Sequence, residues 1–365
     1  MHISIALAMS LMAGVAAHAQ GVEPIRDALT NMPGHLLNKP SAVQFSFVDI
    51  AALRALGSGD IDPTLAERAI IGDALPHFVA LRARGGSYWA ERSLIALANT
   101  RYLAASSLQP VIWGLDSEDT ATATIAALDA LDFDAIGSEG VLSNVGASHP
   151  VDAESLDPWR YAGRDTSYIA AKGNVIIQAI APRLVEATLR DEPDMGDSDV
   201  VNAALGGIEA ALGDGTLVQA MLITPLMGLG GTDREMLLNG RPTLEEMREK
   251  LEAELQPGTE GIPSYLGGFI ADAQGEQPSV MISLAYPDCA IAERAAAHMA
   301  DRWANIKRDD VRGDLEYEVI QASSGLCAAT LNVTDASTDD LSNPTFDAFI
   351  RFRHHFEVLQ IGRSE

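Results

Sequence analysis

Residues 280–306 read VMISLAYPDCAIAERAAAHMADRWANI, and their hydrophobic period changes at Pro287 and Asp288. Before this step, apolar side chains occupy alternate positions from Val280 to Tyr286, which predicts a β-strand. After it, apolar residues recur at three- and four-residue spacing as far as Ile306, which predicts an amphipathic helix. A strand therefore passes into a helix within a very short stretch of chain.

The segments around this stretch predict further strands. Residues 315–319 alternate apolar and acidic side chains, and residues 327–333 alternate again after a turn at Ser323, Ser324 and Gly325. With another strand at 265–272, the order becomes strand, strand, helix, strand, strand. Short connections between successive strands are typical of antiparallel hairpins. The C-terminal part is therefore predicted to be α+β, with a helix packed on one sheet face.

The first half carries a related pattern. Residues 167–190 predict a strand, a turn at 172–174, a second strand and a helix that begins at Pro182. The junction at 178–182 is similar to that at 283–287, because a proline follows a strand in both. We interpret this as a possible internal duplication, although strand–proline–helix junctions are common enough for a chance match. A strand at 43–47 and a helix at 200–212 complete the pattern.

We therefore predict an α+β fold of antiparallel sheets with helices packed on one face. Four segments are expected: a signal peptide (1–19), an N-terminal α+β unit (20–226), a Gly-rich linker with a peripheral helix (227–262), and a C-terminal α+β unit (263–365).

The first residues are typical of a secretory signal. Residues 3–17 are apolar and uncharged, and Ala17-His18-Ala19 gives the small-x-small step of a cleavage site after Ala19. An N-terminal core helix is the alternative interpretation of this run. The segment before it contains no Lys or Arg, which counts against a signal. The run is too short to span a bilayer, which predicts a periplasmic or extracellular protein without a membrane span.

The chain is strongly acidic, with 51 Asp and Glu against 25 Lys and Arg and a net charge of −26. A field of this sign repels phosphate backbones, so nucleic acid is not an expected partner. A small-molecule or protein ligand is expected to be cationic or neutral. The oligomeric state cannot be deduced from these features.

The only two cysteines are predicted to form a disulfide. Cys289 precedes the helix of 291–306 and Cys327 begins a strand, and an even number of cysteines in an exported chain favours pairing. The alternative is a reactive thiolate at Cys289, with its pKa lowered by the helix N-terminus.

Sequence signatures of catalysis are missing: the chain has no G-x-S-x-G, H-E-x-x-H, C-x-x-C, S-x-x-K or Walker motif. The glycines at 228–231 lack a following Lys and are interpreted as linker. No pattern of metal ligands connects the six histidines beyond the signal, which are His35, His77, His149, His298, His354 and His355. Acidic loops at 60–62, 116–119 and 335–340 do not match an EF-hand, and calcium binding there stays open. We therefore predict no catalytic, cofactor-binding or metal-binding residues and no cofactor.

The run FSFVDIAAL at 45–53, the hairpin around Lys172-Gly173-Asn174 and the helix at 197–212 resemble a set of bacterial exported proteins, often lipoproteins, that have no assigned function. The resemblance lies in element order and implies no functional residue, and this chain lacks the cysteine of a lipoprotein signal. The expected function is a non-catalytic binding or interaction protein with its contact region at the seam between the two halves. The alternatives are a hydrolase with a dispersed His and carboxylate site, and a structural envelope factor.

Overall fold

The computed structural model describes residues 21–71, 75–106, 109–136, 140–145, 158–160, 166–190, 192–229, 261–306, 313–336, 341–351 and 354–362. The predicted signal with its cleavage after Ala19 and most of the predicted Gly-rich linker with its peripheral helix (227–262) lie outside these residues, so they stay predictions.

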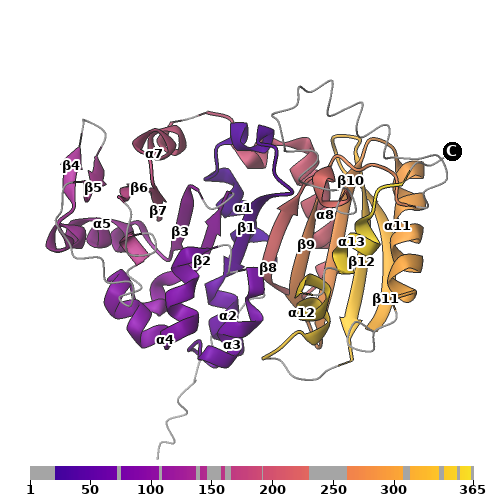
Figure 1. Cartoon of the computed structure of the whole chain (residues 1–365), viewed down its shortest axis with the longest axis horizontal. Helices are drawn as coiled ribbons and strands as arrows, with labels where there is room; N and C mark the ends of the chain where they lie inside the picture. Colours follow the sequence, from indigo (N-terminus) through magenta and orange to yellow (C-terminus); the bar gives the residue numbers. More distant parts are fainter. Residues whose placement is uncertain are drawn as a thin grey trace, which may run out of the picture.

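Among the described residues, twelve strands form one sheet in which every neighbouring pair is antiparallel (Figure 1). The order across the sheet is β11-β12-β10-β9-β8-β1-β2-β3-β7-β6-β5-β4. The strands are β1 (Val43–Asp49), β2 (Thr100–Ala105), β3 (Val111–Leu115), β4 (Asp134–Ile136), β5 (Val141–Ser143), β6 (Tyr168–Lys172), β7 (Val175–Ala179), β8 (Thr216–Ile223), β9 (Gly267–Gln274), β10 (Pro278–Tyr286), β11 (Gly313–Gln321) and β12 (Cys327–Asp335).

Helices cover both faces of this sheet. One face carries α1, α7 and α8, and the other carries α2 to α5 beside the first half and α11 to α13 beside the second. These helices are α1 (Glu23–Thr30), α2 (Ile50–Leu56), α3 (Pro63–Arg68), α4 (Pro76–Ser93), α5 (Glu118–Ala127), α7 (Pro182–Leu189), α8 (Asp199–Leu212), α11 (Cys289–Ala304), α12 (Pro344–Arg351) and α13 (His354–Leu359). The α+β class with antiparallel strands is confirmed. Two details differ from the expectation. All the strands join into one sheet, whereas two separate units were expected. Helices cover both faces of that sheet, whereas only one covered face was expected.

The two halves of the sheet share one strand order. Counted outward from the centre, the first half runs β1, β2, β3, β7, β6 and the second runs β8, β9, β10, β12, β11. In each half a helix, α1 or α8, precedes the innermost strand, and another, α5 or α11, leads from the third strand toward the outer hairpin. Because β1 and β8 pair antiparallel, the halves are related as by a two-fold axis normal to the sheet.

This shared order is what a duplicated unit would give, and duplication itself remains a prediction. The topology matches β7 with β12, whereas the sequence comparison matched β7 with β10 because a proline follows each of these two strands.

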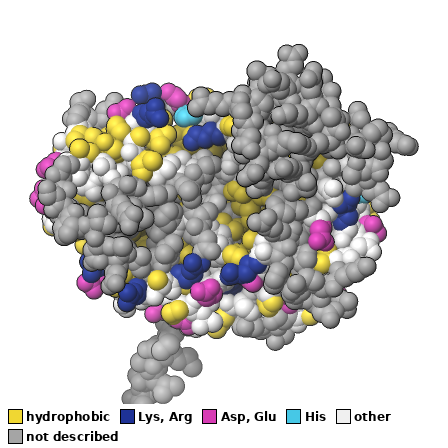
Figure 2. Space-filling view, in the orientation of Figure 1, with side chains coloured by type: hydrophobic (Ala, Val, Ile, Leu, Met, Phe, Trp, Pro, Cys, Tyr) yellow, Lys and Arg dark blue, Asp and Glu magenta, His cyan; other side chains and the backbone are white. Residues whose placement is uncertain are grey.

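Several predicted elements are confirmed with their caps. In α11 the Asp288 side chain accepts a hydrogen bond from the Ile291 backbone N–H at 3.1 Å. In α8 the Ser198 hydroxyl accepts from Val201 at 3.5 Å, and Gly213 ends the helix at a positive φ of 54°. His354 and His355 both belong to α13. Figure 2 shows basic and acidic side chains interspersed on the viewed face.

Candidate functional site

The seam between the two halves contains a buried charged network. Arg68, at the end of α3, donates from Nη2 to Asp272 Oδ1 at 2.8 Å and from Nε to Asp272 Oδ2 at 3.0 Å. Gln219 Nε2 on β8 donates to the same Asp272 Oδ2 at 3.0 Å, and Asn343 Nδ2 donates to Oδ1 at 2.7 Å. Arg68 also donates to Gln274 Oε1 at 2.7 Å. The Asp272 carboxylate therefore binds side chains from three other segments of the chain: α3, β8 and the residue directly before α12.

This network is structural. The side chains of Arg68 and Asp272 are 1% and 0% exposed. Both carboxylate oxygens of Asp272 accept hydrogen bonds from protein donors. Burying such an ion pair is tolerated when hydrogen bonds satisfy it, as they do here. The contact region of the protein was expected at the seam between the two halves. At Arg68 and Asp272 this seam is packed interior, and their ion pair connects α3 to β9.

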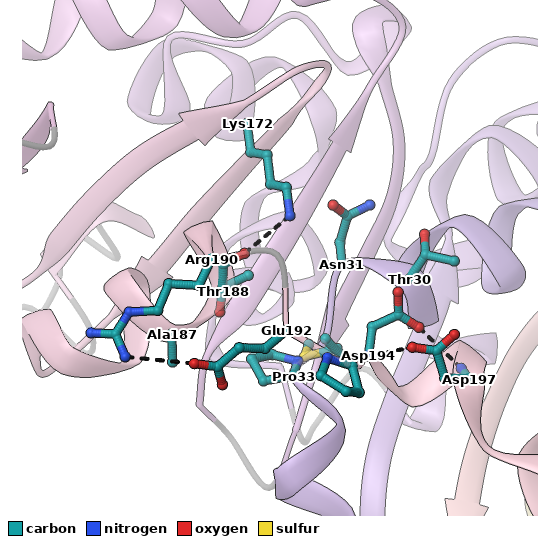
Figure 3. A pocket seen from close by; sticks show the side chains of 12 residues that line it. Thr30, Asn31, Pro33, Lys172, Ala187, Thr188, Arg190, Glu192, Asp194 and Asp197 are labelled. Carbon is teal, nitrogen blue, oxygen red and sulfur yellow. Dashed lines mark hydrogen bonds and ion pairs between the residues drawn. The ribbon is translucent and has the colours of Figure 1, made fainter.

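A polar crevice lies instead on the face of α1 and α7, with a volume of about 350 Å³. It forms where the ends of α1, β6 and α7 meet the connection that leads into α8 (Figure 3). Its lining residues are Thr30, Asn31, Met32, Pro33, Lys172, Ala187, Thr188, Arg190, Glu192, Pro193, Asp194 and Asp197.

Lys172 is the cation that reaches into this crevice from the end of β6 (Figure 3). Its Nζ donates to the backbone oxygen of Thr188 at 3.3 Å, near the C-terminus of α7. A lysine suits this place because carbonyl groups at a helix C-terminus have no partner within the helix. An ammonium group has three donors, so this one hydrogen bond leaves capacity for a ligand. Arg190 also lines the crevice. Its guanidinium nitrogens are 3.7 Å from Glu192 Oε1 and 4.0 Å from Glu186 Oε2.

Two aspartates form the opposite wall. Asp194 Oδ1 accepts from the Asp197 backbone N–H at 3.1 Å, and Asp197 Oδ2 accepts from the Asp194 backbone N–H at 3.0 Å. This reciprocal capping fixes both carboxylates in place. Burial and the neighbouring Asp197 charge raise the pKa of Asp194, while Lys172 acts in the opposite direction. A cationic group entering the crevice would relieve the repulsion between the two carboxylates.

The α1 wall is anchored to the sheet below it. Asp27 Oδ2 accepts from the Tyr102 hydroxyl at 3.1 Å and pairs with Arg101 at 3.2 Å, and Asn31 Nδ2 donates to the Asp27 backbone oxygen at 2.9 Å. Burial, reinforced by the Asp27 carboxylate, raises the pKa of Tyr102, so this hydroxyl stays protonated and donating. Asn31 is thereby held at the rim of the crevice on rigid secondary structure.

The predicted disulfide between Cys289 and Cys327 is confirmed, with the two Cα atoms 5.0 Å apart. It joins the start of α11 to the start of β12 on the face opposite the crevice. The alternative of a reactive thiolate at Cys289 is thereby excluded. Paired cysteines are typical of chains that fold in an oxidising compartment.

The histidines and acidic loops are not assembled into a site among the described residues. His298 is exposed on α11 and His35 is exposed beside α1. His149 and the side chains of His77, His354 and His355 lie outside the described residues. Within the described part of the chain, no three His, Cys, Asp or Glu side chains form a group that could hold a metal ion. Asp62 caps α3, as its place before Pro63 suggests, by accepting from Leu65 N at 2.8 Å.

The residues that line the crevice were not predicted as site residues from the sequence. Lys172 was interpreted only as part of a turn, and the acidic pair at 194 and 197 was not singled out. The Asp-x-x-Asp spacing ahead of the 200–212 helix was the available signal, because it is typical of a reciprocal cap. Nothing local in the sequence indicates that Lys172 faces this pair.

Together these features define an α+β protein with one large antiparallel sheet, a disulfide and a polar crevice of mixed charge. Comparison with family models, with curated proteins and with solved structures finds no significant match. Among the helices formed by the described residues, none is long and apolar enough to cross a membrane.

Proposed function

We propose that this chain is an exported binding protein whose crevice captures a small zwitterion, such as a free amino acid. The observation that carries the proposal is the pairing of opposite charges around one cavity of about 350 Å³. Lys172 would receive the carboxylate of the ligand, and Asp194 with Asp197 would receive its ammonium group.

Preorganisation supports this assignment. Each charged group is already held by a backbone partner, so little side-chain freedom remains to be lost when a ligand binds. The ammonium of Lys172 and the carboxylates retain donors and acceptors for a ligand. A zwitterion also suits a chain of net charge −26, because it carries no net charge to be repelled.

The exported location is part of the same proposal. The disulfide and the apolar run before Ala19 both favour a periplasmic or extracellular protein. The resemblance to bacterial exported proteins agrees with this location and adds no function.

Isothermal titration calorimetry with leucine, leucinamide and N-acetyl-leucine tests the binding mode. Leucinamide lacks the carboxylate and N-acetyl-leucine lacks the ammonium, so each should bind at least about tenfold more weakly than leucine, as expected for a lost charge-assisted hydrogen bond. Lys172→Met should remove the preference for leucine over leucinamide. Asp194→Asn should remove the preference over N-acetyl-leucine.

Asp199→Asn is the matched control, because Asp199 is exposed, stands close in sequence to Asp197 and does not line the crevice. The same titrations should include glycine, glutamine and lysine, so that side-chain selectivity is not mistaken for failure. If no free amino acid binds with a Kd below about 1 mM, or if Lys172→Met binds leucine and leucinamide as the parent does, the proposal fails.

The hydrolase alternative is tested on the same preparations. No histidine is present among the residues that line the crevice. Turnover of ester or peptide substrates that is lost on a single His or carboxylate substitution would establish this alternative over binding.

A further inference from the structure

Strand β11 lies at one end of the sheet order, and β12 is its partner within the described part of the chain. It runs for nine residues, and Asp314, Glu316, Tyr317 and Glu318 along it are exposed. An edge strand directs unpaired backbone N–H and C=O groups outward, and another chain can pair with them. A strand of this length offers a long row of such groups.

The first half of the molecule shows what occupies the matching edge. Strand β6 takes the place in the first half that β11 takes in the second, since each lies outside its hairpin partner, β7 or β12. The edge of β6 is paired by β5, with Leu142 opposite Ile169 and Ser143 opposite Tyr168. Strand β5 belongs to the β4–β5 hairpin, and the described part of the second half contains no counterpart of it.

The chemistry of the β11 edge differs from that of β6. Asp314, Glu316 and Glu318 occupy alternate positions and therefore share one side of β11. On that side a groove of about 480 Å³ runs between β11 and α8, and its walls include Ala210, Ala211, Glu316, Glu318, Thr330 and Asn332. The buried Oδ1 of Asn332, directly across from Glu316, has no hydrogen-bond donor. An incoming strand would therefore meet a row of acidic side chains.

We propose that β11 binds an extended basic segment of another protein, which adds to the sheet as a further antiparallel strand. Backbone hydrogen bonds to β11 supply the pairing, and alternate Lys or Arg side chains of the segment lie against Glu316 and Glu318. This is strand addition, in which the main chain contributes affinity and the side chains contribute selectivity. The acidic row sets the sign of the partner.

A second copy of this chain is a poorer occupant. Two β11 strands paired about Tyr317 would place Glu316 of one copy opposite Glu318 of the other. Like charges directly opposite each other across an antiparallel pair are destabilising. The same glutamates that favour a basic strand thus oppose self-pairing through this edge.

The probe is a fluorescein-labelled eleven-residue peptide that alternates Lys with Val or Thr. Its binding is measured by fluorescence anisotropy and by hydrogen exchange of the β11 amides. We expect saturable binding that weakens as salt rises, with slowed exchange in β11. Two further peptides carry N-methyl groups on the odd or on the even residues. Only one of the two should lose binding, because alternate N–H groups of a strand point to opposite edges.

The charge contribution is tested by the double variant Glu316→Lys/Glu318→Lys. It should bind the Lys peptide at least about tenfold more weakly and gain binding to a peptide with Glu in place of Lys. Its control is Asp129→Lys/Glu276→Lys, which makes the same change in charge at two exposed residues outside β11 and should bind as the parent does. Unfolding midpoints of both variants verify that they fold.

The proposal is overturned if both N-methylated peptides bind like the parent peptide, or if the control double variant loses as much affinity as the β11 variant. Concentration-dependent dimerisation that the Lys peptide cannot displace would instead assign the edge to a second copy. Lys172→Met should leave peptide binding unchanged, so failure of the crevice proposal and failure of this one can be told apart.

Discussion

Substitution of Asp272 should lower the free energy of unfolding by more than the loss of any exposed ion pair would. Asp272→Ala removes the acceptor of four side-chain hydrogen bonds, two from Arg68 and one each from Gln219 and Asn343. It also leaves the Arg68 guanidinium charged and 1% exposed. Breaking one partner of a buried ion pair costs about 3–5 kcal/mol, which is a large share of the about 5–15 kcal/mol by which domains are stable.

The pairwise part of this energy comes from a double-mutant cycle. Arg68→Met, Asp272→Leu and the combined variant are unfolded in urea and followed by tryptophan fluorescence. The combined variant replaces the ion pair by apolar side chains of similar size, so it should be more stable than the sum of the single losses predicts. We expect a coupling energy of about 2–3 kcal/mol.

Arg26 and Glu209 provide the matched control. Their charged atoms are 2.9 Å apart, close to the 2.8 Å between Arg68 and Asp272, but their side chains are 36% and 54% exposed. Exposed pairs typically contribute about 0–1 kcal/mol. If the Arg68–Asp272 coupling is no larger than that of Arg26–Glu209, the network does not fasten the two halves together and our account of the seam is wrong.

Three further predictions concern a buried carboxyl group, the disulfide and two glycines of α8. Burial raises the pKa of Asp49 to about 7 from an ordinary 3.8, although the Ala52 N–H and Arg101 act in the opposite direction. The protonated Asp49 carboxyl therefore contributes its full stabilisation below pH 3.8, and this contribution is lost as pH rises through 7. Asp49→Asn keeps a side-chain cap and should gain up to about 4 kcal/mol relative to the parent between pH 4 and pH 8 in urea unfolding; equal stability differences at the two pH values would contradict this. Removing the disulfide with Cys289→Ala/Cys327→Ala should cost about 4 kcal/mol, since it opens a loop with a sequence separation of 38; a variant within 1 kcal/mol of the parent would show that the bridge constrains little. In α8, Gly207→Ala should destabilise the protein by about 1–3 kcal/mol, because a Cβ there meets the Ser283 and Thr330 hydroxyls. Gly206→Ala should instead stabilise it by up to about 1 kcal/mol, because the space around Gly206 is open. Thermal unfolding that ranks the two variants in the opposite order would refute the packing of α8.

Local elements were predictable because their signals lie within a few residues of each other. The alternation from Val280 to Tyr286 and the helical spacing after it correspond to β10 and α11. The disulfide was predictable because two cysteines allow only one pairing. The burial of Gln44 and Ser46 could not be predicted, because polar residues at alternate positions of a strand usually indicate a solvent-facing side. In the structure β1 is central and both residues are buried, with Gln44 Nε2 donating to the Leu37 and Lys39 backbone oxygens.

Long-range features could not be predicted in this way. Arg68 and Asp272 are 204 residues apart, and neither stands in a motif that indicates its partner. The pairing of β1 with β8 depends on which apolar strands meet, and periodicity does not encode that choice. The crevice has the same origin, because Lys172 and Asp194 meet only once α7 has folded back along β6.

The antiparallel contact of β1 with β8 at the centre of the sheet has a consequence for assembly. Each half, taken alone, would expose its innermost strand along its full length, and two copies of one half could pair through that edge about a true two-fold axis. In the intact chain the two complementary edges are covalently connected, so their meeting is a unimolecular step. Formation of the complete sheet is therefore independent of protein concentration.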